Sequence, residues 1–211
     1  ANRYSTYAKG ASGEKVVPTN QLIGADWGAG AFKYKACDFC DDVFAETADV
    51  VLGDAWLPEY VQDSYGTNVV VTRNDNIQQL IVNARSEGRL VLDDVGVEKA
   101  IQSQDAGLRH RKVAISYRLY CEKAGKSWVP TKRTSPSTSL SPRYEMKRQR
   151  LRTELRDLSH RSFLNAKQAN NLAAYINAVR PVYARYSRQG RPFFRRVLSF
   201  LKRKLNMMIG R

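Results

Sequence analysis

Two short runs of β-branched residues dominate the apolar pattern in the first half of the chain. Residues 48–52 (ADVVL) and 67–73 (TNVVVTR) are rich in valine and bounded by turn residues, so each is predicted to form a strand. The next segment, 74–87, begins with asparagine, a preferred helix N-cap, repeats apolar residues at helical spacing and is followed by glycine, which predicts a helix. With a third strand predicted over 89–92, residues 47–92 are typical of an α/β unit.

The segments on either side of this unit are irregular or helical in pattern. Residues 1–20 are polar and contain glycine and proline, so we expect an irregular start. Residues 97–120 take on a helical pattern, with a break expected at Gly107. Residues 1–124 are therefore predicted to form one domain of the α/β (α+β) class with a mixed sheet.

The rest of the chain is predicted to be a linker followed by basic helices. Residues 125–142 hold three prolines and five serines, which predicts a linker. The extension 143–211 is helical by pattern up to residue 186, with an interruption or bend expected at Pro181. Residues 192–209 place phenylalanine, leucine and methionine on one side and arginine and lysine on the other, which is typical of an amphipathic helix at an anionic membrane surface.

Formal charge divides the chain into two unlike halves. Residues 1–108 contain 9 Lys+Arg and 16 Asp+Glu, a net charge of −7, whereas 109–211 contain 26 and 4, a net charge of +22. The basic half favours a negative partner, which is an anionic membrane, nucleic acid, or an acidic surface of this chain or of another subunit. Nucleic acid is the least favoured, because no recognised nucleic-acid motif occurs. No apolar run reaches 18 residues, so no transmembrane helix is predicted.

The cysteine content and the chain start indicate a cytoplasmic protein. Three unevenly spaced cysteines are too few for the disulfide framework of a small secreted protein, and they fit a reducing compartment. The chain begins without a methionine or an apolar leader. We therefore expect a piece of a longer cytoplasmic protein without a signal peptide.

Cys37 and Cys40 are the only closely spaced cysteines. Their CxxC spacing suits two ligands of a zinc or iron–sulfur centre, a redox dithiol, or two unligated buried thiols. Three neighbouring aspartates disfavour the dithiol, because negative charge raises the pKa of a thiol. Cys121 and His110 are candidates for further ligands, although no local spacing supports either.

Gly53 and Asp54 follow the first predicted strand directly. Loops at the ends of such strands are where α/β folds bind ligands. A glycine there lets the backbone approach a ligand closely, and an aspartate accepts hydrogen bonds from it. An ordinary turn with a capping aspartate is the alternative interpretation.

Three motifs in a fixed order give the sequence a family resemblance. KACDFCD at 35–41, ADVVLGDAW at 48–56 and GTNVVVTR at 66–73 together resemble the C-terminal region of the coenzyme F420 hydrogenase/dehydrogenase beta-subunit family. Residues 103–112, together with 117–119 in the stretch 103–119, are similar to the bacterial branch of that family. The resemblance covers roughly residues 20–135.

The resemblance implies a flavin- and iron–sulfur-dependent oxidoreductase carrying FAD and a 4Fe–4S cluster. Electrons would pass between cluster, flavin and a soluble carrier such as the deazaflavin coenzyme, or a reductase partner, with a link to exopolysaccharide biosynthesis in some similar proteins. Cys37 and Cys40 would be two cluster ligands, and the others are expected upstream of this chain. The chemistry would belong to the cofactors, so no catalytic protein nucleophile is predicted.

The same resemblance assigns residues to the flavin. Gly53 and Asp54 would lie near it, Asn68 would lie on the following strand, and Arg73 would meet a flavin phosphate or a substrate carboxylate. Trp27 lies beside glycine and aspartate, and its ring either stacks on the flavin or anchors a loop.

Two wider alternatives stay open at this stage. The chain is either this oxidoreductase or a non-enzymatic binding module stabilised by zinc at the two close cysteines. As an oxidoreductase it would be cytoplasmic or peripheral to the inner membrane, and a homo-oligomer is one form of assembly. In the second case the basic helices contact an anionic membrane or nucleic acid.

Overall fold

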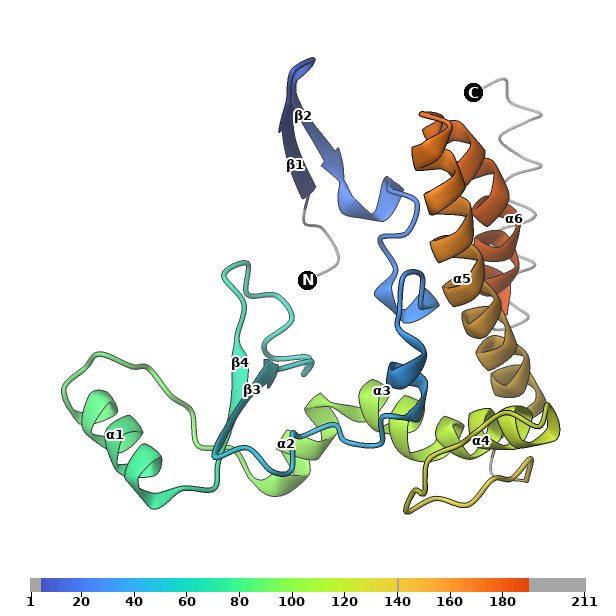
Figure 1. Ribbon diagram of the computed structural model, residues 1–211. Helices are drawn as coiled ribbons and strands as arrows, with labels where there is room; N and C mark the ends of the chain where they lie inside the picture. The colour runs from blue at the N-terminus through green and yellow to red at the C-terminus, as the bar shows by residue number, and fades with distance from the viewer. Residues whose placement is uncertain (1–4, 140, 190–211) are drawn as a thin grey trace, which may run out of the picture. The chain divides into compact units, whose positions relative to one another are not determined.

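The computed structural model describes residues 5–139 and 141–189 and divides the chain into two compact units (Figure 1). The first unit contains Phe39–Pro136, and the second combines Ser5–Asp38 with the residues from Ser137 onward. The helices and two small sheets confirm the mixed α and β class. The mixed sheet predicted from the sequence is wrong, because both two-stranded sheets of the described residues pair neighbouring strands in antiparallel fashion. The division predicted from the sequence, at 1–124, 125–142 and 143–211, stays a prediction about independent domains.

The first unit contains the two valine-rich strands as an antiparallel ribbon. Strand β3 (Val50–Asp54) pairs with β4 (Asn68–Thr72) in a register that sets Val50 opposite Thr72 and Asp54 opposite Asn68. Both strands were predicted from their β-branched residues, and both predictions are confirmed. Gly53 and Asp54 were expected in a loop after the first strand, but the ladder continues through them, so they are the last two residues of β3. The ribbon is the scaffold that carries the Gly-Asp motif.

The prediction of a third strand over residues 89–92 is wrong. The amides of Arg89 and Leu90 donate to the carbonyl of Ala84, at 2.9 and 3.2 Å, and so close the preceding helix instead of joining a sheet. Val91, the most apolar residue of the segment, is 96% exposed. Residues 89–92 have β propensity but no neighbouring strand to pair with. The amides of Arg89 and Leu90 instead form the hydrogen bonds that end the preceding helix.

Helix α1 (Asp75–Ser86) begins and ends as its sequence predicts. The Asn74 side chain accepts hydrogen bonds from two amides of the first turn, and Gly88 follows the helix with a φ of 71°, a left-handed conformation that suits glycine. Its apolar face is only partly covered, because Ala84 is buried while Leu80 is 66% exposed.

The helical segment after residue 96 breaks at a different place from the one predicted. The break lies at Gln104, between α2 and α3, and Gly107 lies inside a helix with its backbone close to Val43. The sequence favoured glycine as the helix breaker, whereas the side chain of Gln104 is bonded to the ribbon at this junction. The elements in order are α2 (Val97–Ser103), α3 (Asp105–Leu108), the π-helical turn η4 (Arg109–Val113) and α4 (Ala114–Ala124).

The first unit has a small core on α4. Ile115 and Leu119 are almost fully buried and pack with Phe39, while Val129 from the following coil covers them in part. Residues 125–139, which were predicted to be a linker, contain no helix or strand.

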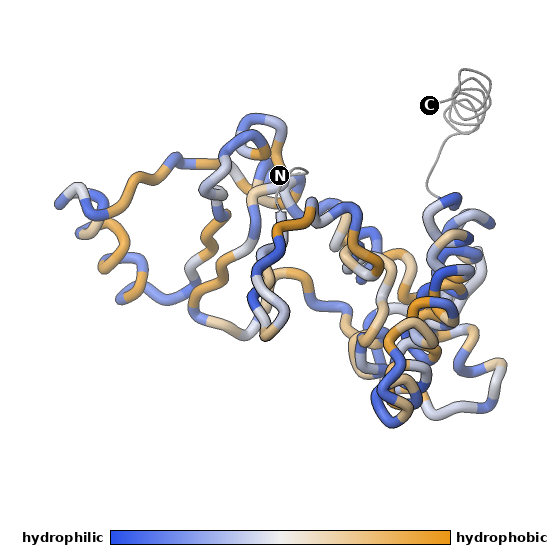
Figure 2. Tube along the Cα trace, turned by 90° about the horizontal axis from the view of Figure 1, so that it is seen from above, coloured by the Kyte–Doolittle hydropathy of each residue, from blue (hydrophilic) through white to orange (hydrophobic). Residues whose placement is uncertain are grey.

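The second unit is built on a helical hairpin of α5 (Arg143–Gln168) and α6 (Leu172–Gln189). The hairpin turns at Asn170, whose φ of 48° is left-handed, and not at Pro181, which lies inside α6. The interruption expected at the proline is therefore wrong, because α6 and its buried face continue on both sides of it, and the bend that was the other expectation stays a prediction. In Figure 2, both hydrophobic and hydrophilic residues occur in the helical hairpin.

A second ribbon, β1 (Ser5–Gly10) with β2 (Gly13–Pro18), replaces the irregular start expected for residues 1–20. Its residues are almost all exposed on both faces. Because neither face is buried, the sequence carries no alternation of apolar and polar residues from which the ribbon could be recognised. Short 3-10 turns follow it: η1 (Thr19–Gln21), η2 (Trp27–Ala29) and η3 (Lys35–Phe39).

Within residues 5–139 and 141–189, no helix has the length and apolar content needed to cross a bilayer. The amphipathic helix predicted over 192–209 lies outside the described residues.

Candidate functional site

One end of the β3–β4 ribbon brings two predicted site residues together. The pairing register sets Asp54 directly opposite Asn68, and the ladder continues for one step through the amide of Ala55, which donates to the carbonyl of Thr67 at 2.9 Å. Both predicted side chains are exposed. Within the described residues, neither the Asp54 carboxylate nor the Asn68 side-chain amide has a hydrogen-bond or ion-pair partner. An acceptor and a donor–acceptor group therefore lie side by side and are available to a ligand.

Gln104 fixes this end of the ribbon from the junction of α2 and α3. Its Nε2 donates to the main-chain oxygen of Asp54 at 2.7 Å. The same nitrogen would lie 3.4 Å from a Cβ at Gly53, and Val69 Cγ1 would lie at 3.6 Å. Both distances correspond to ordinary van der Waals contact, so Gly53 packs directly against Gln104 and Val69. Sequence reasoning included Gln104 in the family-like stretch 103–119 but gave it no role.

Replacing Gln104 by leucine is expected to lower the free energy of unfolding by about 1 kcal/mol, because one hydrogen bond to a main-chain carbonyl is lost at similar side-chain volume. Amide hydrogen exchange at residues 53–57 should also become faster. Gln102→Leu, an exposed position two residues earlier on α2, is the control and should leave exchange at those residues unchanged. Equal exchange in both variants would show that Gln104 does not hold the Gly-Asp segment.

The surroundings of the Gly-Asp segment are apolar and ordered. Leu52 and Trp56 on either side of it are 68% and 50% exposed. The loop before β4 is held by Asp63, whose carboxylate accepts from the Tyr65 amide and the Thr67 hydroxyl, both at 2.9 Å. The pair at the ribbon end is thus bordered by two exposed apolar side chains and by a loop that hydrogen bonds hold in place.

Arg73 lies at the opposite end of the ribbon, immediately after the position where Val50 faces Thr72. Its amide donates to the carbonyl of Asp49 at 2.8 Å. Its guanidinium donates to three main-chain carbonyls of the preceding loop, at distances of 2.9 to 3.2 Å: those of Phe44, Ala45 and Ala48. In this structure Arg73 therefore organises the loop that leads into β3, and its predicted contact with a phosphate or carboxylate stays a prediction.

Cys40 is half-buried in the first unit next to a cation. Its thiol Sγ lies 3.5 Å from the carbonyl of Asp42, and Arg111 Nη1 lies 3.7 Å from the same sulfur. Arg111 also donates to the carbonyl of Asp42. The Cys40 thiol and the Arg111 guanidinium are thus held by the same main-chain carbonyl.

The aspartate after Cys40 is likewise paired with cations. Asp41 contacts Lys132 at 3.3 Å and Arg133 at 3.5 Å. Burial acts to raise the pKa of Asp41, but the hydrogen bond and charge of Lys132 outweigh it, so this pKa lies below its ordinary value. Two cations therefore compensate the charge of Asp41, one of the three aspartates that the sequence places beside the close cysteines. The choice among metal ligand, redox dithiol and unligated thiol stays open.

Cys37 is exposed on η3 and belongs to the second unit, since the boundary between the units falls between Asp38 and Phe39. The neighbouring Asp38 is buried, and it is paired with Lys33 at 2.7 Å and with Arg156. The chain thus holds the residue after Cys37 firmly, while the thiol itself faces outward.

The described residues do not complete a metal centre. No group of three or more His, Cys, Asp or Glu side chains among them is arranged to hold a metal ion. Cys121 is exposed on α4, and the ring of His110 lies 3.3 Å from a guanidinium nitrogen of Arg118. A 4Fe–4S cluster takes about four ligands, so two thiols from this part of the chain do not hold one alone.

Trp27 lies on η2 in the second unit, with 76% of its side chain exposed. Its loop packs on α5 through glycine: Gly30 has a φ of 86°, and a Cβ there would lie 3.6 Å from the main-chain oxygen of Arg152. The loop around Trp27 is therefore close to the backbone of α5. Stacking of the Trp27 ring on a flavin stays a prediction.

Comparison with known proteins links the first half of the chain to one family. Residues 4–98 match the family described as the C terminus of the beta subunit of coenzyme F420 hydrogenase/dehydrogenase. The match covers both close cysteines and the β3–β4 ribbon, and it ends before Gln104. None of the curated proteins and none of the solved structures matches the chain.

Proposed function

We propose a redox function on the premise that this chain, through residues 4–98, belongs to the family formed by the C-terminal region of coenzyme F420 hydrogenase/dehydrogenase beta subunits. The function that the site supports best is that of a flavin-dependent oxidoreductase subunit. The observation that carries this proposal is that Asp54 and Asn68 lie opposite each other at the end of the ribbon. Both side chains are exposed and have no hydrogen-bond or ion-pair partner among the described residues.

These residues fit one part of FAD. The Asp54 carboxylate accepts hydrogen bonds from a ribose hydroxyl or a ring N–H, and the Asn68 amide both donates and accepts. Gly53 lets the ligand and the backbone come close, and the half-exposed Trp56 offers an aromatic face beside them. FAD, when bound, supplies the hydride- and electron-transfer chemistry. The role of this chain is to bind and orient the cofactor.

Cys37 and Cys40 are proposed as two ligands of an iron–sulfur centre completed by residues outside the described part of the chain. The basis is their CxxC spacing and the Arg111 guanidinium beside the Cys40 thiol. The described residues alone do not fit a complete cluster, so no electron-transfer step is assigned to it here.

The proposal includes a redox carrier or reductase as partner. It also includes a cytoplasmic location, peripheral to the inner membrane. The membrane contact is assigned to residues 190–211, whose sequence is basic and amphipathic. Cosedimentation with anionic vesicles, lost on removal of residues 190–211, tests that contact. The family resemblance alone suggests three further features. They are use of the deazaflavin coenzyme, a link to exopolysaccharide biosynthesis and formation of a homo-oligomer.

The flavin proposal is tested by titrating FAD into the 211-residue chain under anaerobic conditions and following flavin fluorescence. We expect saturable binding that weakens about tenfold or more in Asp54→Asn, because a hydrogen bond to a charged group contributes about 1.5–3 kcal/mol. Asp75→Asn, an exposed aspartate at the start of α1, is the matched control and should bind FAD like the parent chain. Absence of binding, or equal affinities of the two variants, would overturn the assignment of this site.

A further inference from the structure

Residues 128–133, here named the strap, are coil that packs beside the segment carrying Cys40. At the first end of the strap, Val129 partly covers the cluster of buried residues around Phe39. The ring of Trp128 lies 6.4 Å from that of Phe39, edge to face. The strap therefore begins on the residue immediately before Cys40.

The other end of the strap is held by ion pairs to residues that follow Cys40. Lys132 and Arg133 lie 3.3 and 3.5 Å from the carboxylate of Asp41. Arg133 also forms a two-point ion pair with Glu46, at 2.7 and 3.2 Å. The strap thus contacts the chain on both sides of Cys40, which is itself half-buried.

The strap has no main-chain anchor within the described part of the chain. No hydrogen bond there between two main-chain groups involves residues 128–136. The ion pair that closes the second end is open to solvent, since the side chains of Arg133 and Glu46 are 60% and 44% exposed. Exposed ion pairs are individually weak and are screened by salt. This end of the strap can therefore detach while the helices and the ribbon stay folded.

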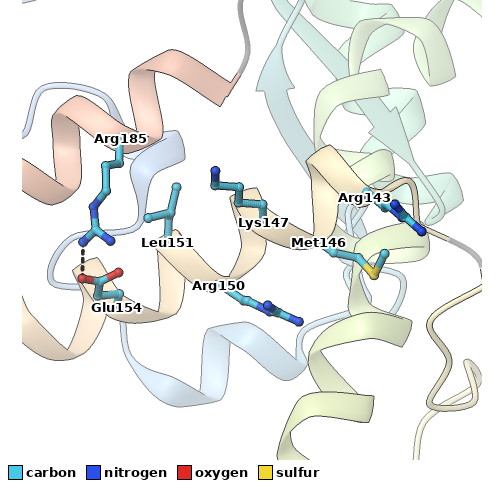
Figure 3. A pocket seen from close by; sticks show the side chains of 7 residues that line it. All are labelled: Arg143, Met146, Lys147, Arg150, Leu151, Glu154 and Arg185. Carbon is cyan, nitrogen blue, oxygen red and sulfur yellow. Dashed lines mark hydrogen bonds and ion pairs between the residues drawn. The ribbon is translucent and has the colours of Figure 1, made fainter.

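An exposed ion pair on the helical hairpin provides a contrast. Arg185 of α6 pairs with Glu154 of α5 in a groove between the helices (Figure 3). The two helices also share a buried core that includes Leu155 and Val179, so the hairpin does not depend on this ion pair. The second end of the strap has no such core beneath it among the described residues, and it does depend on its ion pairs.

We propose that the strap is a lid over Cys40, closed by the ion pairs of Lys132 and Arg133 and opened when these ion pairs are screened. Closed, the strap hinders large molecules from approaching the thiol. Opened, it lets a metal donor or an electrophile reach the sulfur. The proposal concerns access to the Cys40 thiol and not the group that this thiol binds, so it stands or fails separately from the flavin and iron–sulfur proposals.

The test is the rate of Cys40 labelling in the metal-free chain carrying Cys37→Ser and Cys121→Ser, in which Cys40 is the single thiol. Two neutral reagents, iodoacetamide and a much larger polyethylene glycol maleimide, are compared by mass spectrometry. In the double variant Lys132→Gln/Arg133→Gln, we expect the large reagent to react about threefold faster or more, because the open strap is more populated. Iodoacetamide should gain less, since a small reagent needs less movement of the strap.

Lys123→Gln/Lys126→Gln is the matched control, because it removes the same charge from two exposed positions just before the strap. Both labelling rates should stay as in the single-thiol chain. Raising NaCl from about 20 to about 500 mM should accelerate the large reagent in the single-thiol chain and in the control, but not in the strap variant. Circular dichroism of each variant confirms that the helices are intact.

Two results would overturn the proposal. One is the same rate of labelling by the large reagent in the strap variant and in the control, which would mean that the ion pairs do not keep the strap closed. The other is equal acceleration of both reagents in the strap variant, which would reflect a change in the reactivity of the sulfur and not in its exposure.

Discussion

Replacing Arg156 by methionine is expected to lower the free energy of unfolding by about 3 kcal/mol. Arg156 and Asp38 are 6% and 7% exposed, and they form an ion pair inside the second unit. The substitution leaves a buried carboxylate without its main cation, a change that typically costs about 3–5 kcal/mol. Lys33, 2.7 Å from the same carboxylate, remains and keeps the loss at the lower end of this range.

Urea unfolding followed by circular dichroism measures this effect, because α5 and α6 contribute much of the helical signal. Arg161→Met, an exposed arginine on the same helix, is the control and should change stability by about 0.5 kcal/mol or less. The double variant Asp38→Asn/Arg156→Met should regain part of the loss, because the unpaired charge is removed as well. Equal stability of Arg156→Met and Arg161→Met would show that the buried pair is not stabilising.

The elements that were predictable from the sequence are those whose local signals agree with their surroundings. The β3–β4 ribbon follows from β-branched runs between turn residues, and α1 follows from an N-cap at Asn74 and a glycine stop at Gly88. The β1–β2 ribbon gave no signal because neither of its faces is buried. The false third strand had the right residues, but its first amides complete α1 instead.

The candidate site was predictable only in part, for a physical reason. The Gly-Asp motif and Asn68 were identified from the order of motifs, and the pairing of two adjacent strands brings them together. Gln104 supports the same site from 50 residues away, through one hydrogen bond from its side-chain amide to the main-chain oxygen of Asp54. No local sequence pattern predicts this contact. Arg156, one of many arginines on α5, is likewise distinguished only by the buried Asp38 that the fold places beside it.

The core of the helical hairpin carries the second large effect, at Leu155. Leu155 is fully buried and packs in a cluster with Val179 and Tyr175 of α6, so Leu155→Ala is expected to destabilise the chain by about 2–5 kcal/mol through lost contacts and a residual cavity. Leu164→Ala, on the same helix but 56% exposed, removes the same atoms from a partly solvated position and should cost less than about 1 kcal/mol. Hydrogen exchange along α6 should accelerate in the first variant alone, because α6 packs against this face of α5. If the two leucine variants unfolded at the same urea concentration, the hairpin core would not be what stabilises the second unit.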